Sequence, residues 1–290
     1  MNEPRKSGAL LLIIAAILFG FMAILAKRAA ARISGPEVAF IRFTIGIAIC
    51  GMVALKVRFR LVNWRGLILR GALGGVAVHL FFIAIAHLPI GIATLLNYTS
   101  PIFTALWAAI FLREPIGART MAALGITSIG VALVIRGNAP PDTFGFGAWQ
   151  LVGIGSAILS GAAVATIREV RRTDGTWEIF GSLCLIGAII TAGPSARAWI
   201  TPTSFEWLVL VGMGVTAAAA QILMTYSLGY VRASSSGVIA QLTPVSTIAL
   251  GWMIYGDRQT WLAITGAIIT LLGVTWGALR ITRESSEVNV

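Results

Sequence analysis

The chain has 290 residues, of which 57% are hydrophobic and only 11% are charged, and its formal net charge is +11 at pH 7. A soluble protein of this length carries about 25% charged residues, and one core of this size cannot hide so much apolar surface. The composition therefore excludes a soluble globular protein and predicts an integral membrane protein.

The positive charge does not indicate a nucleic-acid partner. The Lys and Arg residues lie in short clusters between apolar runs rather than along one polar face. That distribution is typical of the loops of a membrane protein, where positive residues collect on the cytoplasmic side. We therefore expect a lipid bilayer around the chain and no nucleic acid.

The first apolar run holds 20 uncharged residues, from Ser7 to Ala26, after a basic start. It is too long for the core of a signal peptide, and no convincing cleavage site follows it. We interpret it as the first of ten transmembrane helices. The predicted spans are 8–27, 36–55, 67–87, 91–112, 118–136, 148–167, 177–194, 205–228, 234–255 and 260–279.

Loop charges predict the orientation of these spans. With the N-terminus inside, the inner loops hold fifteen Lys and Arg residues, Arg70 among them, and the outer loops hold six. The positive-inside rule then places both termini in the cytoplasm of a bacterial cell, with the chain in the inner membrane.

The two halves of the chain resemble each other at a nearly constant offset. Ser100-Pro101 falls on Thr243-Pro244 and Gly130-Val131 on Gly273-Val274 at an offset of 143, and Gly20 falls on Gly161 at 141. Each half holds five predicted helices, an odd number, so the second half enters the membrane with the opposite orientation. The sequence thus predicts an all-α protein of two inverted five-helix repeats, 1–140 and 141–290, around a central cavity.

Several short motifs add a family resemblance. They are LFG in the first span, PEVAFIRF opening the second, and SP, RE and GITSIGV closing the first half. With two five-helix units, they resemble EamA-type members of the drug/metabolite transporter superfamily. The second half departs from the pattern, with Gly256-Asp257-Arg258 in place of the usual Gly-Glu and Leu183 opposite Arg42. The resemblance implies export of small metabolites, with bacterial exporters of amino acids, including aromatic ones, as the closest group.

Polar residues inside the spans are the candidate substrate contacts. His79 lies near the predicted bilayer midplane, where a polar side chain needs a protein partner or a water-filled cavity. Asn97 and Gln241 precede prolines in the fourth and ninth spans, and Gln221 lies in the eighth. Each of these side chains can line a cavity or simply hydrogen-bond a neighbouring helix. The deep aromatic residues Tyr98 and Trp107 can line an apolar pocket or pack in the core.

Three further residues are candidates for shaping or gating the cavity. Pro101 and Pro244 each remove a helical hydrogen bond and predict a kink, and they recur in both halves. Arg42 is the only full charge well inside a predicted span. A substrate-carboxylate clamp is one interpretation of Arg42. Snorkelling to the interface, or pairing with Glu37 or Asp257, is the interpretation that the sequence favours.

The distribution of acidic and thiol groups narrows the mechanism. All eleven Asp and Glu residues lie in loops or at span ends, which disfavours a sodium site or a carboxylate proton relay. Coupling, if any, would have to go through His79, and a facilitator is the alternative. Cys50 and Cys184 lack metal-ligand spacing, no phosphate-binding loop occurs, and we expect no metal, cofactor or obligate protein partner.

The sequence therefore predicts a transporter that exports a small metabolite, most specifically a neutral or aromatic amino acid. The first alternative is an exporter of drugs or other lipophilic compounds, which would call for a membrane-embedded acid if they were cationic. A membrane-embedded enzyme is a remote alternative, because His79 has no Asp, Glu or Cys near it in sequence.

Overall fold

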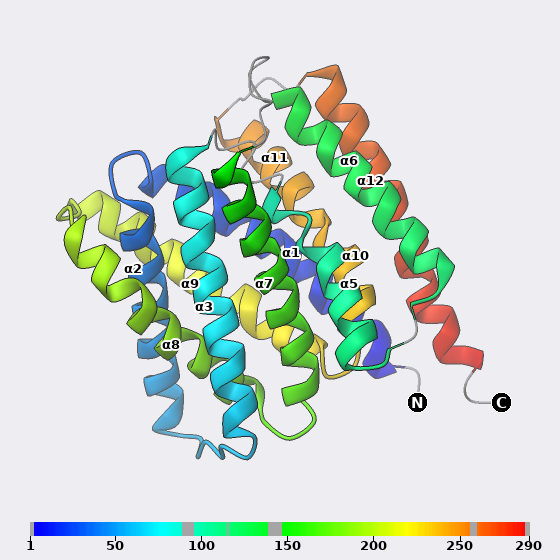
Figure 1. Ribbon diagram of the computed structural model, residues 1–290, viewed down its shortest axis with the longest axis horizontal. Helices are drawn as coiled ribbons and strands as arrows, with labels where there is room; N and C mark the ends of the chain where they lie inside the picture. The colour runs from blue at the N-terminus through cyan, green and yellow to red at the C-terminus, as the bar shows by residue number, and fades with distance from the viewer. Residues whose placement is uncertain (1–2, 89–95, 115, 139–146, 256–259, 288–290) are drawn as a thin grey trace.

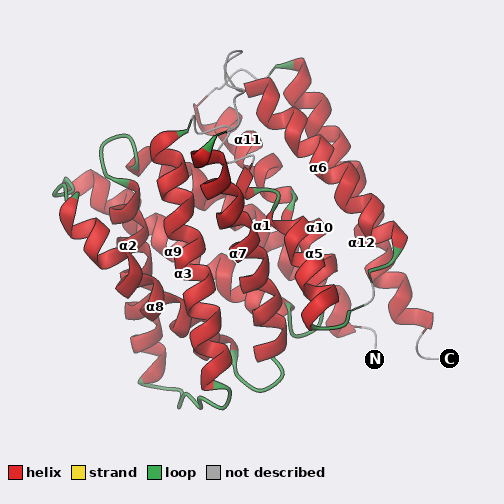
Figure 2. Ribbon diagram, in the orientation of Figure 1, coloured by secondary structure: helices red, strands yellow, loops and turns green. Residues whose placement is uncertain are grey.

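The computed structural model describes residues 3–88, 96–114, 116–138, 147–255 and 260–287. Every regular element within these ranges is a helix (Figure 2), as the sequence predicts for an all-α protein. The helices are α1 Glu3–Ala29, α2 Gly35–Ala54, α3 Trp64–His87, α5 Ser100–Phe111, α6 Ala118–Asn138, α7 Ala148–Val170, α8 Thr176–Arg197, α9 Ser204–Ser227, α10 Ala233–Ala240, α11 Leu242–Tyr255 and α12 Trp261–Glu287.

Local signals in the sequence explain where several helices begin. Pro36 lies in the first turn of α2, where its missing N–H is not needed. The Asn63 side chain caps α3 by accepting a hydrogen bond from the Gly66 amide at 2.9 Å. Thr203 and Glu206 form a capping box at the start of α9. The loops that these residues end are short.

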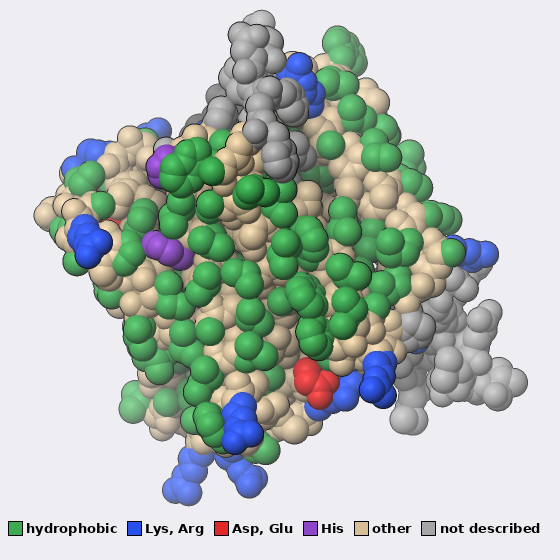
Figure 3. All heavy atoms as spheres, viewed as in Figure 1, with side chains coloured by type: hydrophobic (Ala, Val, Ile, Leu, Met, Phe, Trp, Pro, Cys, Tyr) green, Lys and Arg blue, Asp and Glu red, His purple; other side chains and the backbone are tan. Residues whose placement is uncertain are grey.

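The helices are long and apolar enough to form a multi-pass membrane protein. Within the described ranges, eight segments of 20 to 24 residues qualify as membrane spans, and Ser100–Phe111 and Trp261–Gly277 are shorter apolar helices. Large hydrophobic side chains such as Leu208, Ile189 and Met253 are each at least 68% exposed. Figure 3 shows hydrophobic side chains across the middle of one face, with Lys and Arg gathered toward its edges. Lipid is the solvent that such a surface requires.

The predicted fourth and ninth spans are interrupted helices. Residues 89–95 of the fourth span lie outside the described ranges; after them, a turn at Tyr98-Thr99 precedes α5. In the ninth span, Gln241 separates α10 from α11. The sequence predicts kinks at Pro101 and Pro244. The structure places both prolines in the turn that follows an interruption, where a proline does not break a helical hydrogen bond.

Helix packing repeats between the two halves. At the offset found in the sequence, α1 corresponds to α7, α2 to α8, α3 to α9, α5 to α11 and α6 to α12. Helix α1 packs on α9 and α11, and its counterpart α7 packs on α3 and α5. Helices α6 and α12 pair with each other along the right-hand side of Figure 1. Corresponding helices thus have corresponding neighbours.

The closest helix contacts occur at glycines and repeat in the same way. A Cβ atom on Gly20 would lie 3.0 Å from the Thr247 amide, and one on Gly161 would lie 2.7 Å from the Thr104 amide. Likewise, a Cβ on Gly130 would approach the Thr270 amide to 2.7 Å, and one on Gly273 would approach Thr127 Cγ2 to 2.7 Å. These backbones touch because the glycines carry no side chain, which is how helices associate in lipid.

We predict that Gly130→Ala destabilises the protein by about 1–3 kcal/mol, because the added methyl group meets the backbone of α12. Gly125→Ala, also on α6, is the matched control, because a Cβ there has no neighbour within 4 Å. Thermal unfolding in detergent should show a lower midpoint for Gly130→Ala alone. Equal midpoints for the two variants would contradict the packing described for α6 and α12.

Candidate functional site

The two interrupted helices meet at their interruptions. The Gln241 amide nitrogen donates to the Tyr98 carbonyl oxygen at 3.4 Å and to the Ser128 hydroxyl at 3.3 Å. Gln241 is fully buried, and its Oε1 has no partner among the described residues. Two of the predicted cavity residues, Gln241 and Tyr98, are therefore brought together across the two halves.

The small residues after the first interruption face protein. Pro101, Thr104 and Ala108 are buried on one face of α5, as their spacing predicts. Thr104 lies against Gly161 of α7, and Pro101 lies against Gly237 of α10. The Thr104 hydroxyl donates to the Ser100 carbonyl within its own helix at 3.0 Å. This stripe is a packing surface, so only Asn97, before the interruption, is left as a candidate contact on it.

The other predicted cavity residues are placed apart. The Trp107 indole donates to the Ile158 carbonyl of α7 at 3.1 Å. Gln221 is buried in α9, and its amide donates to Thr225, one turn along the same helix, at 3.4 Å. His79 is partly buried on α3, and its shielded Nδ1 has no partner among the described residues. No contact in the described part of the chain joins His79 to Asn97, Gln221 or Gln241, and their role in a shared cavity stays a prediction.

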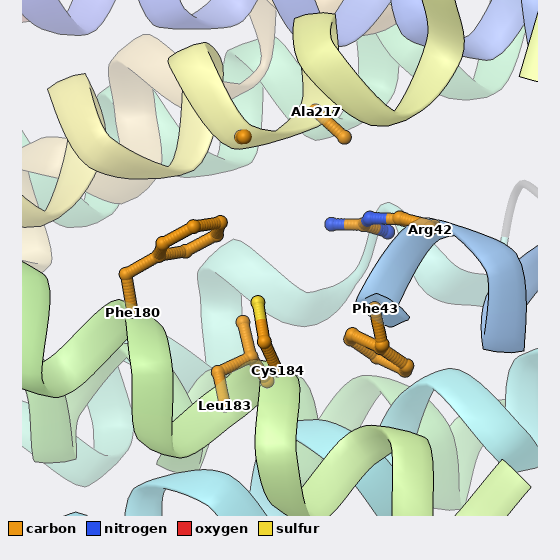
Figure 4. Close-up of a pocket in the computed structure, with 7 residues that line it drawn as sticks. Arg42, Phe43, Phe180, Leu183, Cys184 and Ala217 are labelled. Atoms are coloured by element: carbon orange, nitrogen blue, oxygen red, sulfur yellow. The ribbon is translucent and has the colours of Figure 1, made fainter. Parts of the chain in front are cut away.

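A pocket lies where α2, α8 and α9 meet (Figure 4). It is small, with a cavity volume of about 10 Å³, and all but one of its lining side chains are uncharged. The Arg42 guanidinium points into it from α2, across from the Phe180 ring, and the Cys184 sulfur points into it from α8. The lining residues are Arg42, Phe43, Phe180, Leu183, Cys184, Ala217 and Ala218.

Of the two acidic partners that the sequence offers for Arg42, Glu37 does not pair with it. Its guanidinium carbon lies 5.7 Å from the centre of the Phe43 ring rather than at a salt bridge with Glu37. Glu37 is fully buried and accepts a hydrogen bond from the Ile200 amide at 2.9 Å. The other partner considered, Asp257, lies outside the described residues. Within those residues, no hydrogen bond or ion pair engages the Arg42 guanidinium.

Arg70 is a second charged residue inside the bundle, and sequence reasoning missed it. The sequence places Arg70 among the inner-loop charges, but α3 begins at Trp64, three residues earlier than predicted, and Arg70 is only 4% exposed. Its Nε has no hydrogen-bond partner among the described residues. The Arg70 guanidinium lies over Gly74, in the space that a side chain would fill. The glycine one turn after the arginine was the signal that could have revealed this burial.

The pocket combines equivalent positions from the two halves. Arg42 and Leu183, and likewise Phe43 and Cys184, are related by the offset of 141, and all four line the pocket. The flanking glycines match too: a Cβ on Gly187 would lie 2.7 Å from the Phe43 ring, while Gly46 packs against Cys184. These equivalent positions differ in charge at Arg42 and Leu183 and in size at Phe43 and Cys184.

Comparison with known proteins gives matches over both halves. The EamA-like transporter family matches residues 6–136 and again residues 147–277. A solved crystal structure with 21% sequence identity superposes with a TM-score of 0.82, covering 96% of this chain and 98% of the other. The second match supports the fold alone.

Curated relatives span nearly the whole chain. A pseudopaline exporter of Pseudomonas aeruginosa is 26% identical over 271 residues, covering 92% of this chain and 94% of the relative. A riboflavin transporter of Rhizobium johnstonii is 24% identical, covering 93% and 90%. An S-adenosylmethionine uptake transporter of Rickettsia bellii is 22% identical, covering 86% and 85%. These relatives differ in cargo and share membrane transport.

We predict that Gln241→Leu destabilises the protein more than Gln221→Leu does. Gln241 links the two halves by hydrogen bonds to Tyr98 and Ser128, whereas Gln221 bonds only within its own helix. The loss should be about 0.6–2 kcal/mol, the usual size of an interhelical hydrogen bond in a membrane protein. Thermal unfolding of the two variants in the same detergent measures the difference, and an unchanged midpoint for Gln241→Leu would contradict it.

Proposed function

Because the chain belongs to the EamA-like transporter family, we propose that it exports small amino-acid-like metabolites by alternating access between two inverted repeats. The protein is a membrane transporter rather than an enzyme, because its family and its named relatives are transporters. The single observation that carries the proposed mechanism is the hydrogen bond between Gln241 and Tyr98, which joins the interruptions of corresponding helices in the two halves.

Several contacts support an inverted repeat with units at 1–140 and 141–290. The family matches each half separately, and the neighbours of corresponding helices correspond. Glu37 accepts a hydrogen bond from the Ile200 amide, and its counterpart Glu178 accepts one from the Arg60 amide at 3.1 Å. Repeats related in this way have two near-equivalent packings, which is what alternating access requires.

Interrupted helices suit this mechanism. Backbone groups released at an interruption must be satisfied by protein or by a water-filled cavity, since lipid offers no partner. Here the Gln241 side chain satisfies the Tyr98 carbonyl. If water or substrate replaced the Gln241 side chain as the partner of the Tyr98 carbonyl, the two halves could separate on one side of the membrane. Tyr98, Asn97 and Gln241 are the residues that we propose line the opened path, with Pro101 and Pro244 fixing the helix ends beside it.

The proposed cargo and direction follow from the sequence and the relatives together. The candidate cavity residues predicted from the sequence are a few uncharged polar side chains among apolar segments, which suits a zwitterion with an apolar side chain, and one relative is named as an exporter. The excess of Lys and Arg in the predicted inner loops supports cytoplasmic termini in a bacterial inner membrane. Neutral and aromatic amino acids are the first compounds to test.

We predict that the purified protein in liposomes catalyses counterflow of labelled amino acids, and that unlabelled amino acids compete. His79→Ala should retain counterflow but lose acceleration by an imposed pH gradient if His79 carries the proton. If the protein is a facilitator, neither the wild type nor His79→Ala should respond to the pH gradient. Absence of exchange for all twenty amino acids would contradict the proposed cargo.

A further inference from the structure

Two arginines without described partners lie inside the bundle on consecutive helices. Arg42 is on α2 and Arg70 is on α3, and neither guanidinium has an ion pair or hydrogen bond among the described residues. A charge removed from water costs several kcal/mol unless it is paired. Charged residues inside membrane proteins therefore face a cavity or a partner, and they mark functional sites by default.

The two arginines converge on the same part of α8. Arg42 points into the pocket that Leu183 and Cys184 line (Figure 4). A Cβ on Gly74, which the Arg70 guanidinium covers, would lie 2.7 Å from Leu183 Cδ1. Leu183 thus lines the pocket that Arg42 enters from α2, and it also lies beside the glycine that the Arg70 guanidinium covers on α3.

The two charges also share a level in the bundle. Helices α2 and α3 are joined by a short loop at the bottom of Figure 1, so they run in opposite directions. Arg42 lies twelve residues before the end of α2, about 18 Å from it. The Arg70 guanidinium lies beside Gly74, which is ten residues after the start of α3 and about 15 Å from that end. The two guanidinium groups therefore lie at a similar level, near the middle of the bundle.

The position of the pocket indicates a site for cargo. It is formed by equivalent residues of the two halves, and repeat transporters bind their substrates at the interface between repeats. Phe180, Phe43 and Leu183 supply apolar walls for a carbon chain beside the charged end. Two guanidinium groups without a counter-charge can be balanced by two negative charges, and the planar fork of arginine matches a carboxylate.

We propose that Arg42 and Arg70 bind the carboxylates of the transported metabolite, and that its preferred class carries two of them, as an acidic amino acid does. The inference rests on the proposed transport function and changes its preferred cargo from neutral and aromatic amino acids to acidic ones. Neutral amino acids offer one carboxylate and leave the second arginine unpaired. Acidic amino acids compensate both charges.

Glutamate and glutamine provide a matched test, because they share their shape and differ in one charge. In counterflow, glutamate should compete at least about tenfold better than glutamine, the effect of one charge-assisted hydrogen bond. Arg42→Gln and Arg70→Gln should each abolish this preference and raise the KM for glutamate. Arg42→Lys and Arg70→Lys keep the positive charge and should retain part of the preference for glutamate. Arg119→Gln, at an exposed position on α6, is the control and should behave as the wild type.

The ratio of glutamate to glutamine does not depend on how much protein is folded, so poor yield of a variant does not obscure the result. An unchanged ratio in both Gln variants would overturn the assignment while leaving the transport function intact. Competition by inorganic phosphate but not by glutamate would overturn the carboxylate class.

A binding measurement separates the site from the transport function. Glutamate should raise the thermal unfolding midpoint of the detergent-solubilised wild type, and it should not do so for Arg42→Gln or Arg70→Gln. If wild-type liposomes exchange no amino acid and this pattern still holds, the site stands and the proposed function fails. If glutamate stabilises the Gln variants as much as the wild type, the site is wrong.

Discussion

The close approach of helix backbones at glycines is the constraint on which the rest of the structure depends. Lipid tails are as apolar as the helix surfaces, so no hydrophobic force drives these helices together, and contact must come from close packing. Gly20, Gly161, Gly130 and Gly273 provide that contact in both halves. Gly46 and Gly187 do the same where α2 crosses α8. Because those two helices touch there, the pocket beside them stays small and its walls come from equivalent positions.

The buried arginines work against this packing. An arginine in a tightly packed interface needs space and a counter-charge, and the described structure supplies mainly space: the open pocket for Arg42 and the missing side chain of Gly74 for Arg70. Local arrangements that reduce stability without a visible compensation are characteristic of functional positions. The stripe of Pro101, Thr104 and Ala108 is the opposite case, since its polar group is satisfied within its own helix and its surface is filled by protein.

Hydropathy in the sequence predicts the spans because lipid demands long apolar runs, and the repeat predicts which helices correspond. The sequence predicts much less well which side of each helix faces the other half of the protein. Helices α2 and α8 are apolar around most of their circumference, so no periodic pattern reveals which side of Arg42 or Leu183 meets the other half. The depth of His79 was readable from the sequence, but depth does not specify a neighbour. Arg70 was missed because it lies only three residues inside the predicted span 67–87 and was counted with the inner-loop charges, whereas its burial depends on which side of α3 it occupies.

The hydrogen bond between Gln241 and Tyr98 has a consequence for how tightly the membrane stays sealed. It ties an interruption in one half to the matching interruption in the other, so displacement of either strains a shared contact. In alternating access, one barrier closes the substrate path on each side of the membrane. Two barriers linked in this way tend to open and close in turn rather than independently. A carrier whose barriers opened independently would dissipate ion gradients each time both happened to be open. Under the proposed alternating-access mechanism, a single buried amide would therefore help to keep the membrane potential from leaking through the transporter.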